Sequence, residues 1–108
     1  MRAPALALAA LALAGPAYAQ AHSPRDYAVA AVGMLDLYGR RCVALKGPLP
    51  EGLAEKVASE AKALGVDAAQ DAWTRIRIRT MSDAMDRDSA VDWPAWCDGA
   101  LVFLRTPR

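Results

Sequence analysis

Histidine and cysteine are scarce in this sequence of 108 residues, which contains one His and two Cys. Three such residues are too few to complete a structural zinc site, and the absence of a C-x-x-C-H sequence excludes covalently attached c-type haem. The sequence also lacks the glycine loops, nucleophile elbow and metalloprotease motifs that mark common enzyme classes. We therefore expect a protein that is not an enzyme and that has no cofactor.

Long hydrophobic runs are equally rare, and the one that occurs stands at the start of the chain. Arg2 supplies a positive charge, residues 3–14 are apolar apart from Pro4, and Ala17-Tyr18-Ala19 has the small-x-small pattern of a cleavage site. This order is typical of a secretory signal peptide. The apolar run is shorter than the roughly 20 residues that a membrane span needs.

These features divide the chain in two. We predict a signal peptide at residues 1–19 and a single helical domain at residues 20–108. Cleavage after Ala21 is an alternative, because Ala19-Gln20-Ala21 is also a small-x-small sequence. In either case we expect the protein to be exported to the periplasm or secreted.

An excess of charge of one sign is also missing. The chain has 13 basic and 12 acidic residues, a net charge of +1, and loss of Arg2 with the signal peptide would bring that to zero. A neutral chain has no bulk attraction for nucleic acid or for anionic lipid. We expect no nucleic-acid partner and no stable membrane insertion after cleavage.

The two cysteines, Cys42 and Cys97, can form one intramolecular disulfide. An even number of cysteines in an exported chain favours a structural bond. A redox function is the alternative, but the sequence has no C-x-x-C motif, and the wide spacing offers no local means of lowering a thiol pKa. We predict a structural disulfide.

Apolar residues recur at spacings of three and four, which predicts short helices. A first helix begins at Ser23-Pro24-Arg25-Asp26, a capping-box pattern, and ends at Gly47-Pro48. A second begins around Pro50-Glu51 and ends at Gly65. The predicted buried faces are Tyr27, Ala31, Met34, Tyr38, Cys42 and Leu45 in the first helix, and Leu53, Val57, Ala61 and Leu64 in the second.

The second half of the chain predicts two further helices. Asp67 is the expected cap of the third, with Gln70 three residues on, and Asp92 caps the fourth, with Pro94 in its first turn. Residues 74–80 and 101–104 also fit strands, because 74–80 alternates and 101–104 is a short apolar run. The predicted buried faces are Ala69, Trp73, Ile76, Thr80 and Ala84, then Trp96, Cys97, Ala100, Leu101 and Leu104. The predicted fold is an all-α bundle of three or four helices with one disulfide.

Aromatic residues near the end of the chain are candidates for protein binding: Trp93, Trp96 and Phe103. More often, such residues cover a small core beside a disulfide. Three arginines, Arg75, Arg77 and Arg79, are candidates for an anion site, because all three would point to one side of a strand. In a helix they would instead form a solvated face paired with aspartates, for example Asp83 with Arg79 or Arg87.

Metal binding has one candidate. If cleavage follows Ala19, the exported chain begins Gln20-Ala21-His22, whose amine, amides and imidazole can surround copper(II) or nickel(II) in a square plane. The acidic cluster Asp83, Asp86, Asp88 and Asp92 does not fit a calcium loop, because in a loop counted from Asp86 the sixth and twelfth positions are Val91 and Cys97. Helix capping and solvation explain these aspartates.

Export, small size and the lack of catalytic motifs favour a non-enzymatic function. We expect a protein that binds another protein in the periplasm, as an accessory subunit or a chaperone-like factor. The alternative is a small-ligand or metal binder that uses the arginines or the Gln20-Ala21-His22 terminus.

Overall fold

A computed structural model describes residues 23–106 of the chain, and the regular elements in this part are all helices. They are α3 (Pro24–Arg41), α4 (Val43–Lys46), α5 (Leu53–Ala63), α6 (Ala72–Asp86) and α7 (Trp93–Arg105). The prediction of a small all-α bundle is confirmed, and both possible strands are helical. The predicted signal peptide and the Gln20-Ala21-His22 terminus lie outside the described residues.

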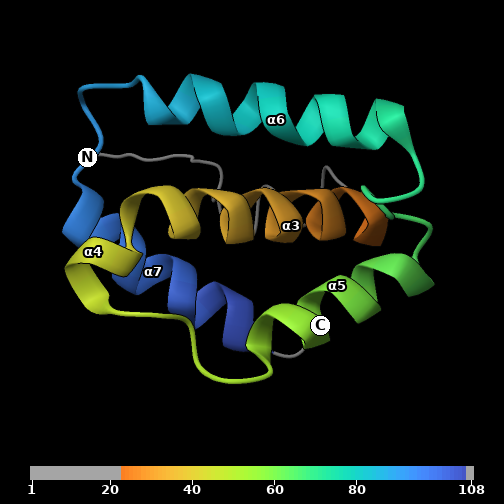
Figure 1. Ribbon diagram of the computed structural model, residues 1–108, viewed down its shortest axis with the longest axis horizontal. Coiled ribbons are helices and arrows are strands. Elements are labelled where there is room, and N and C mark those ends of the chain that lie inside the picture. Colours follow the sequence, from red (N-terminus) through yellow and green to blue (C-terminus); the bar gives the residue numbers. More distant parts are fainter. Residues whose placement is uncertain (1–22, 107–108) are drawn as a thin grey trace.

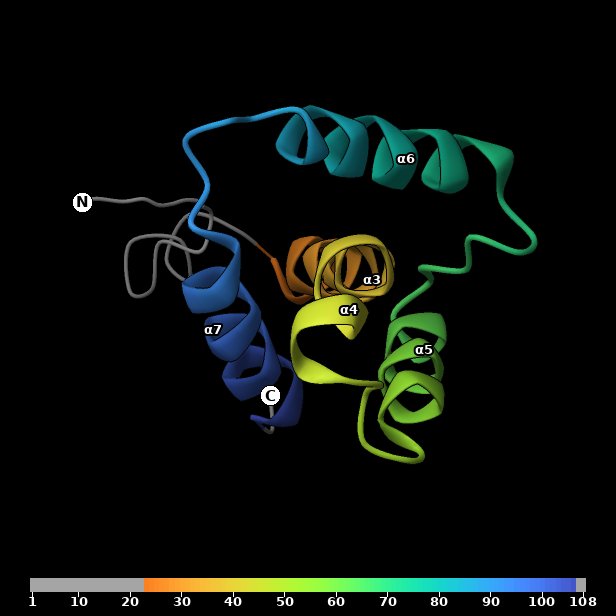
Figure 2. The ribbon, with the colours of Figure 1, turned by 60° about the vertical axis from the view of Figure 1, so that its left-hand side comes forward.

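Helix α3 is the centre of the bundle (Figure 1). Helices α5 and α7 lie on one side of it and also contact each other, whereas α6 lies on the other side and packs on α3 alone among the described helices (Figure 2). The one-turn helix α4 contacts α3 and α7. Among the described helices, α5 and α7 are therefore covered by more than one neighbour, whereas α6 is covered by α3 alone.

The beginning of α3 is held by the predicted capping box. The Asp26 amide donates to Ser23 Oγ at 3.2 Å, and the Ser23 amide donates to Asp26 Oδ2 at 3.1 Å. The prediction that this helix runs on to Gly47 is wrong, because α3 ends at Arg41 and the chain turns at Cys42 before α4. The helical periodicity is broken at that turn, so Leu45 is exposed rather than buried.

The predicted disulfide joins Cys42 to Cys97, with a Cα–Cα distance of 5.7 Å. Both cysteines are fully buried. The bond fastens the end of α3 to α7 within a core formed by α3, α5 and α7. The buried members of this core are Ala31, Met34, Tyr38, Cys42, Leu53, Val57, Cys97, Ala100 and Leu104.

Helix α6 is rotated relative to the prediction. It buries Thr74, Ile78 and Ser82, whereas Trp73 and Ile76 are exposed to 70% and 57%. Ser82 Oγ donates to the Gly33 carbonyl at 3.4 Å, so two small residues meet where α6 crosses α3. Small side chains allow that close approach, and Ile78 is the large apolar residue that α6 buries, whereas Trp73 and Ile76 face away from the bundle.

The cap of α6 is also different from the prediction. Asp71, not Asp67, accepts hydrogen bonds from the Thr74 hydroxyl at 2.6 Å and from the Trp73 amide at 3.1 Å. The Thr74 hydroxyl in particular holds the pKa of Asp71 below its ordinary value. Asp67 instead accepts from the Ala69 amide within the preceding turn. The helix consequently begins four residues later than an Asp67 cap would place it.

Candidate functional site: an apolar cleft between α3, α5 and α7

A cleft of about 850 Å³ lies between α3, α5 and α7. Its walls are mostly alkyl and aromatic, and Glu60 is the one charged residue among the described residues that line it. Each of the three helices contributes to it. The lining includes Tyr27, Ala28 and Ala31 of α3, Val57 and Ala61 of α5, and Gly99, Val102 and Phe103 of α7.

The cleft is hollow because small residues stand where the helices face each other. Ala28, Ala31 and Ala61 are buried but end at a methyl group, which leaves the space above them unfilled. Gly99 has no side chain, and a Cβ atom placed there would meet nothing within 4 Å. The space between α3, α5 and α7 is therefore left unfilled at this end of the bundle.

Larger apolar side chains form the rim. The Tyr27 and Phe103 rings stack with their centroids 6.2 Å apart and their planes inclined by 24°. Val102 is 66% exposed and Leu64 is 44% exposed, so the rim presents apolar surface to solvent. The prediction that Leu64 belongs to the buried stripe of its helix is wrong, since α5 ends at Ala63 just before it.

Of the three aromatic residues expected to bind a partner, Phe103 lines this cleft and the two tryptophans do not. The Trp93 and Trp96 rings make an edge-to-face contact at 5.3 Å near the start of α7. Trp96 packs against the core that contains the disulfide, and the Arg41 guanidinium lies 5.0 Å from the centre of the Trp93 ring. This placement favours the alternative interpretation, in which the tryptophans cover the core.

The three candidate anion-binding arginines are spread around α6. Successive helical residues are about 100° apart, so Arg77 points about 160° away from Arg75 and Arg79. Arg75 Nη1 donates to the Ala68 carbonyl at 2.7 Å. The strand geometry that would gather all three on one side is absent from the part of the chain that the structure describes.

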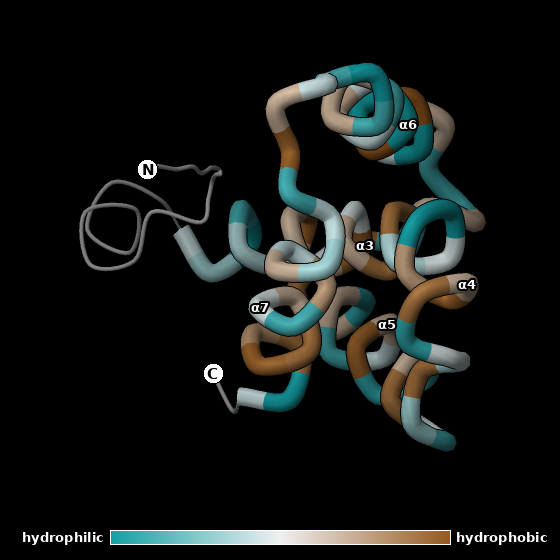
Figure 3. The backbone as a smooth tube through the Cα atoms, turned by 90° about the vertical axis from the view of Figure 1, so that its left-hand side faces the viewer, coloured by the Kyte–Doolittle hydropathy of each residue, from teal (hydrophilic) through white to brown (hydrophobic). Residues whose placement is uncertain are grey.

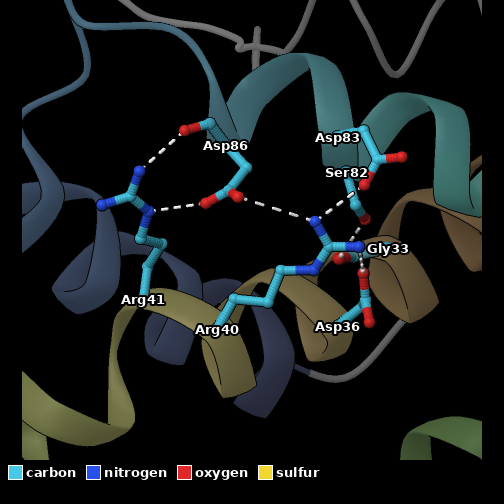
Figure 4. A network of polar contacts seen from close by, with 7 residues as sticks. All are labelled: Gly33, Asp36, Arg40, Arg41, Ser82, Asp83 and Asp86. Atoms are coloured by element: carbon cyan, nitrogen blue, oxygen red, sulfur yellow. Dashed lines mark hydrogen bonds and ion pairs between the residues drawn. The ribbon is translucent and has the colours of Figure 1, made fainter.

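A polar network joins the C-terminal ends of α3 and α6 (Figure 4). Arg40 Nη1 donates to Asp83 Oδ1 at 2.8 Å, and Arg40 Nη2 lies 3.1 Å from Asp36 Oδ2. The hydrogen bond with Asp83 and the attraction of the nearby carboxylates raise the pKa of Arg40 above its ordinary value. The expected pairing of Asp83 with Arg79 or Arg87 is therefore wrong.

Arg41 completes the network. Its Nε donates to Asp86 Oδ1 at 2.6 Å, and its Nη2 donates to the Asp86 carbonyl at 2.7 Å. Asp88 accepts from the Ala90 amide, and Asp92 accepts from the Ala95 amide at the start of α7. These partners account for the acidic cluster, and residues 23–106 contain no group of three His, Cys, Asp or Glu arranged to hold a metal ion.

Comparisons with models of protein families, with curated proteins and with solved structures find no match for this chain. Within residues 23–106, none of the helices combines the length and the apolar character needed to cross a membrane. The cleft was not predicted from the sequence, because alanine and glycine leave no periodic signal of an unfilled space.

Proposed function

We propose that this protein is a non-enzymatic binding protein that holds an apolar segment of a partner protein in the cleft between α3, α5 and α7. The observation that carries the proposal is the apolar rim: Leu64 and Val102 are exposed beside the half-buried Phe103. Exposed apolar surface that borders a hollow is typical of an interaction site.

The exposure of the rim favours a protein over a small molecule. A site for a small ligand usually buries 70–90% of the ligand surface. Val102 and Leu64 line the cleft but are 66% and 44% exposed, so a ligand that fills only the cleft would leave much of their surface in water. A partner protein can insert an apolar side chain and cover the rim at the same time. Glu60 in the lining favours a partner with a lysine or arginine beside its apolar residues.

We infer that the partner is met outside the cytoplasm. The predicted signal peptide at residues 1–19 is one support, and the disulfide between Cys42 and Cys97 is another, because such bonds persist in oxidising compartments. An accessory subunit or a chaperone-like factor of the periplasm fits these features.

An apolar small molecule is the second candidate. The cleft volume of about 850 Å³ lies within the range of roughly 300–1,000 Å³ that small-molecule sites occupy. A fatty acyl chain would suit walls of this kind. The two candidates differ in whether the rim residues are covered by the occupant.

Two matched glycine variants test both candidates. Gly99→Leu places a side chain in the cleft, and Gly39→Leu places the same side chain on the exposed surface of α3; at both positions an added Cβ would meet nothing within 4 Å. A photo-crosslinking amino acid at Val102, in cells of the source organism, would capture the partner. We expect a discrete crosslinked protein that Gly99→Leu abolishes and Gly39→Leu preserves.

Other results would change the conclusion. The small-molecule candidate is correct if no protein is crosslinked but the purified protein binds the dye N-phenyl-1-naphthylamine. Fatty acids should then displace the dye, and Gly99→Leu should prevent its binding. If neither a protein nor the dye binds, or if Gly99→Leu has no effect on either, the cleft is not a binding site.

A further inference from the structure

The three walls of the cleft share one spacing and one length. Residues 24–31 at the start of α3, residues 57–64 at the end of α5 and residues 99–106 at the end of α7 each line it at positions i, i+3, i+4 and i+7. Those four positions form one face of a helix over two turns, a length of about 10 Å. The cleft is therefore bounded by three helix faces of two turns each.

The other described helices leave this cleft open. Helix α6 lies across α3 from it (Figure 3) and contributes none of the described lining residues. The one-turn helix α4 contacts α3 and α7 but also lies outside the lining. The described part of the bundle thus has space for one more helix beside α3, α5 and α7.

The volume of the cleft and the chemistry of its walls both suit a helix. A two-turn helix about 10 Å across occupies roughly 800 Å³, close to the cleft volume of about 850 Å³. An extended segment would span the same length with about three residues and would leave most of the space empty. It would also bring unpaired backbone amides and carbonyls to helical walls, which offer no strand edge, whereas a helix bonds those groups internally.

Glu60 adds a charge to one wall. Its side chain is exposed, and it has no ion-pair partner within residues 23–106. The other described residues of the lining are uncharged. A carboxylate beside an apolar surface is complementary to a segment that carries a lysine or arginine next to its apolar residues.

We propose that the partner segment in the cleft is an amphipathic α-helix of about two turns, with apolar residues at i, i+3 or i+4 and i+7 and a basic residue that pairs with Glu60. The inference rests on the proposed function, since it needs the cleft to be a protein-binding site, and it adds the conformation and the charge of the bound segment. The apolar stripe of that helix lies over Ala28 and Ala61, where the walls are small, and Val102 and Leu64 contact its flanks.

Fluorescence anisotropy with two designed peptides tests the conformation. Both carry a fluorescein label. The first has leucine at i, i+3, i+4 and i+7, lysine on both flanks of that stripe and alanine elsewhere, and the second replaces two central alanines by proline, which prevents a helix. We expect the purified protein to bind the first at least about tenfold more tightly than the second. Gly99→Leu should weaken binding of the first peptide, and Gly39→Leu should not.

A charge exchange at Glu60 tests the predicted pairing. Glu60→Lys should weaken binding of the lysine-flanked peptide by about threefold or more, as expected for an exposed ion pair, and a glutamate-flanked version should prefer this variant to the wild type. Glu55→Lys is the matched control, because Glu55 is exposed on the same helix but is not among the lining residues. Added salt should reduce the differences.

The failures of this inference and of the proposed function are distinguishable. If both peptides bind equally and Gly99→Leu blocks both, the inference is wrong and the proposed function stands. The same holds if neither peptide binds although a partner is crosslinked at Val102. If neither peptide binds and no protein is crosslinked, both are wrong. Peptide binding that Gly99→Leu leaves unchanged would also overturn the inference, and an effect of Glu55→Lys equal to that of Glu60→Lys would overturn the predicted ion pair.

Discussion

Reduction of the disulfide should lower the free energy of unfolding by about 4 kcal/mol. Cys42 and Cys97 are 55 positions apart, and closing a loop of that length removes about 14 cal/mol/K of entropy from the unfolded chain. Proteins of this size have a total stability of roughly 5–10 kcal/mol. The reduced protein should therefore retain only about 1–6 kcal/mol of stability, and its helices should melt at a clearly lower temperature than those of the oxidised protein.

The reduced and oxidised proteins can be compared without any change of side chain. Both cysteines are fully buried in the core shared by α3, α5 and α7, so the reduced and oxidised proteins contain the same side chains and differ in one bond. A Cys42→Ala, Cys97→Ala variant would add the loss of buried sulfur atoms to the effect of the missing bond. Reduction is the better perturbation for this reason.

Urea titration followed by circular dichroism at 222 nm measures the difference. One sample stays oxidised, and the other is reduced in urea and kept under tris(2-carboxyethyl)phosphine, since a buried bond is accessible to reductant only when the chain opens. The midpoint for the reduced sample should fall well below that of the oxidised one. A difference in unfolding free energy smaller than about 1 kcal/mol would refute the reasoning, because it would mean that the disulfide does not appreciably restrict the unfolded chain.

Three further predictions concern α3, α5 and α6. The Thr74 hydroxyl lowers the pKa of Asp71, so the stability that Asp71 confers should be complete above about pH 4 and lost as the pH falls through the lower pKa of the folded state. Measured as melting temperature against pH, this part of the pH dependence should be missing in Asp71→Asn. Gly39→Ala should stabilise α3 by about 0.5–1 kcal/mol, whereas Gly52→Ala, at φ 82°, should destabilise the protein by about 1 kcal/mol, as measured in urea. Ile78→Ala should cost about 2–4 kcal/mol and Ile76→Ala less than about 0.5 kcal/mol, and equal losses would contradict the observed rotation of α6.

Local chemistry made several elements predictable. The Ser23 capping box and the Asp92 cap each place a hydrogen-bond acceptor where a helix has unpaired amides, so the starts of α3 and α7 could be identified from a few residues. The inner face of α7 was also predicted, since Cys97, Ala100 and Leu104 are buried. In that helix the spacing of three and four residues identifies the buried side, although most of its large apolar residues are only partly buried and Val102 is exposed.

The rotation of α6 could not be predicted by the same reasoning. Periodicity assigns the inside to the most apolar stripe, which contains Trp73 and Ile76. In the structure, Thr74 and Ser82 are inside because α6 approaches α3 closely at Gly33, and Thr74 bonds to the capping Asp71. The fit between two helix surfaces decides this orientation, and it involves residues 49 positions apart.

The binding of Asp83 by Arg40 and of Asp86 by Arg41 was unpredictable for a related reason. Sequence reasoning pairs charges within one helix at spacings of four, but the network in Figure 4 joins two helices. Which arginine reaches which aspartate depends on how α6 crosses α3. The same crossing turns Trp73 and Ile76 toward solvent, so the packing of α6 on α3 determines both the ion pairs and the exposed apolar surface.

The exposed apolar surface follows from how the core is built. Alanines fill much of the contact between the helices, at Ala28, Ala31, Ala61 and Ala100, and a core of small residues buries little apolar area for each residue. The disulfide offsets that deficit, because its effect on stability does not depend on buried area. Large side chains such as Trp73 and Val102 are then not needed inside and can face solvent at two separate places. If that reasoning holds, Trp73→Ala and Val102→Ala should each leave the urea midpoint nearly unchanged, and Val102→Ala should weaken binding in the cleft.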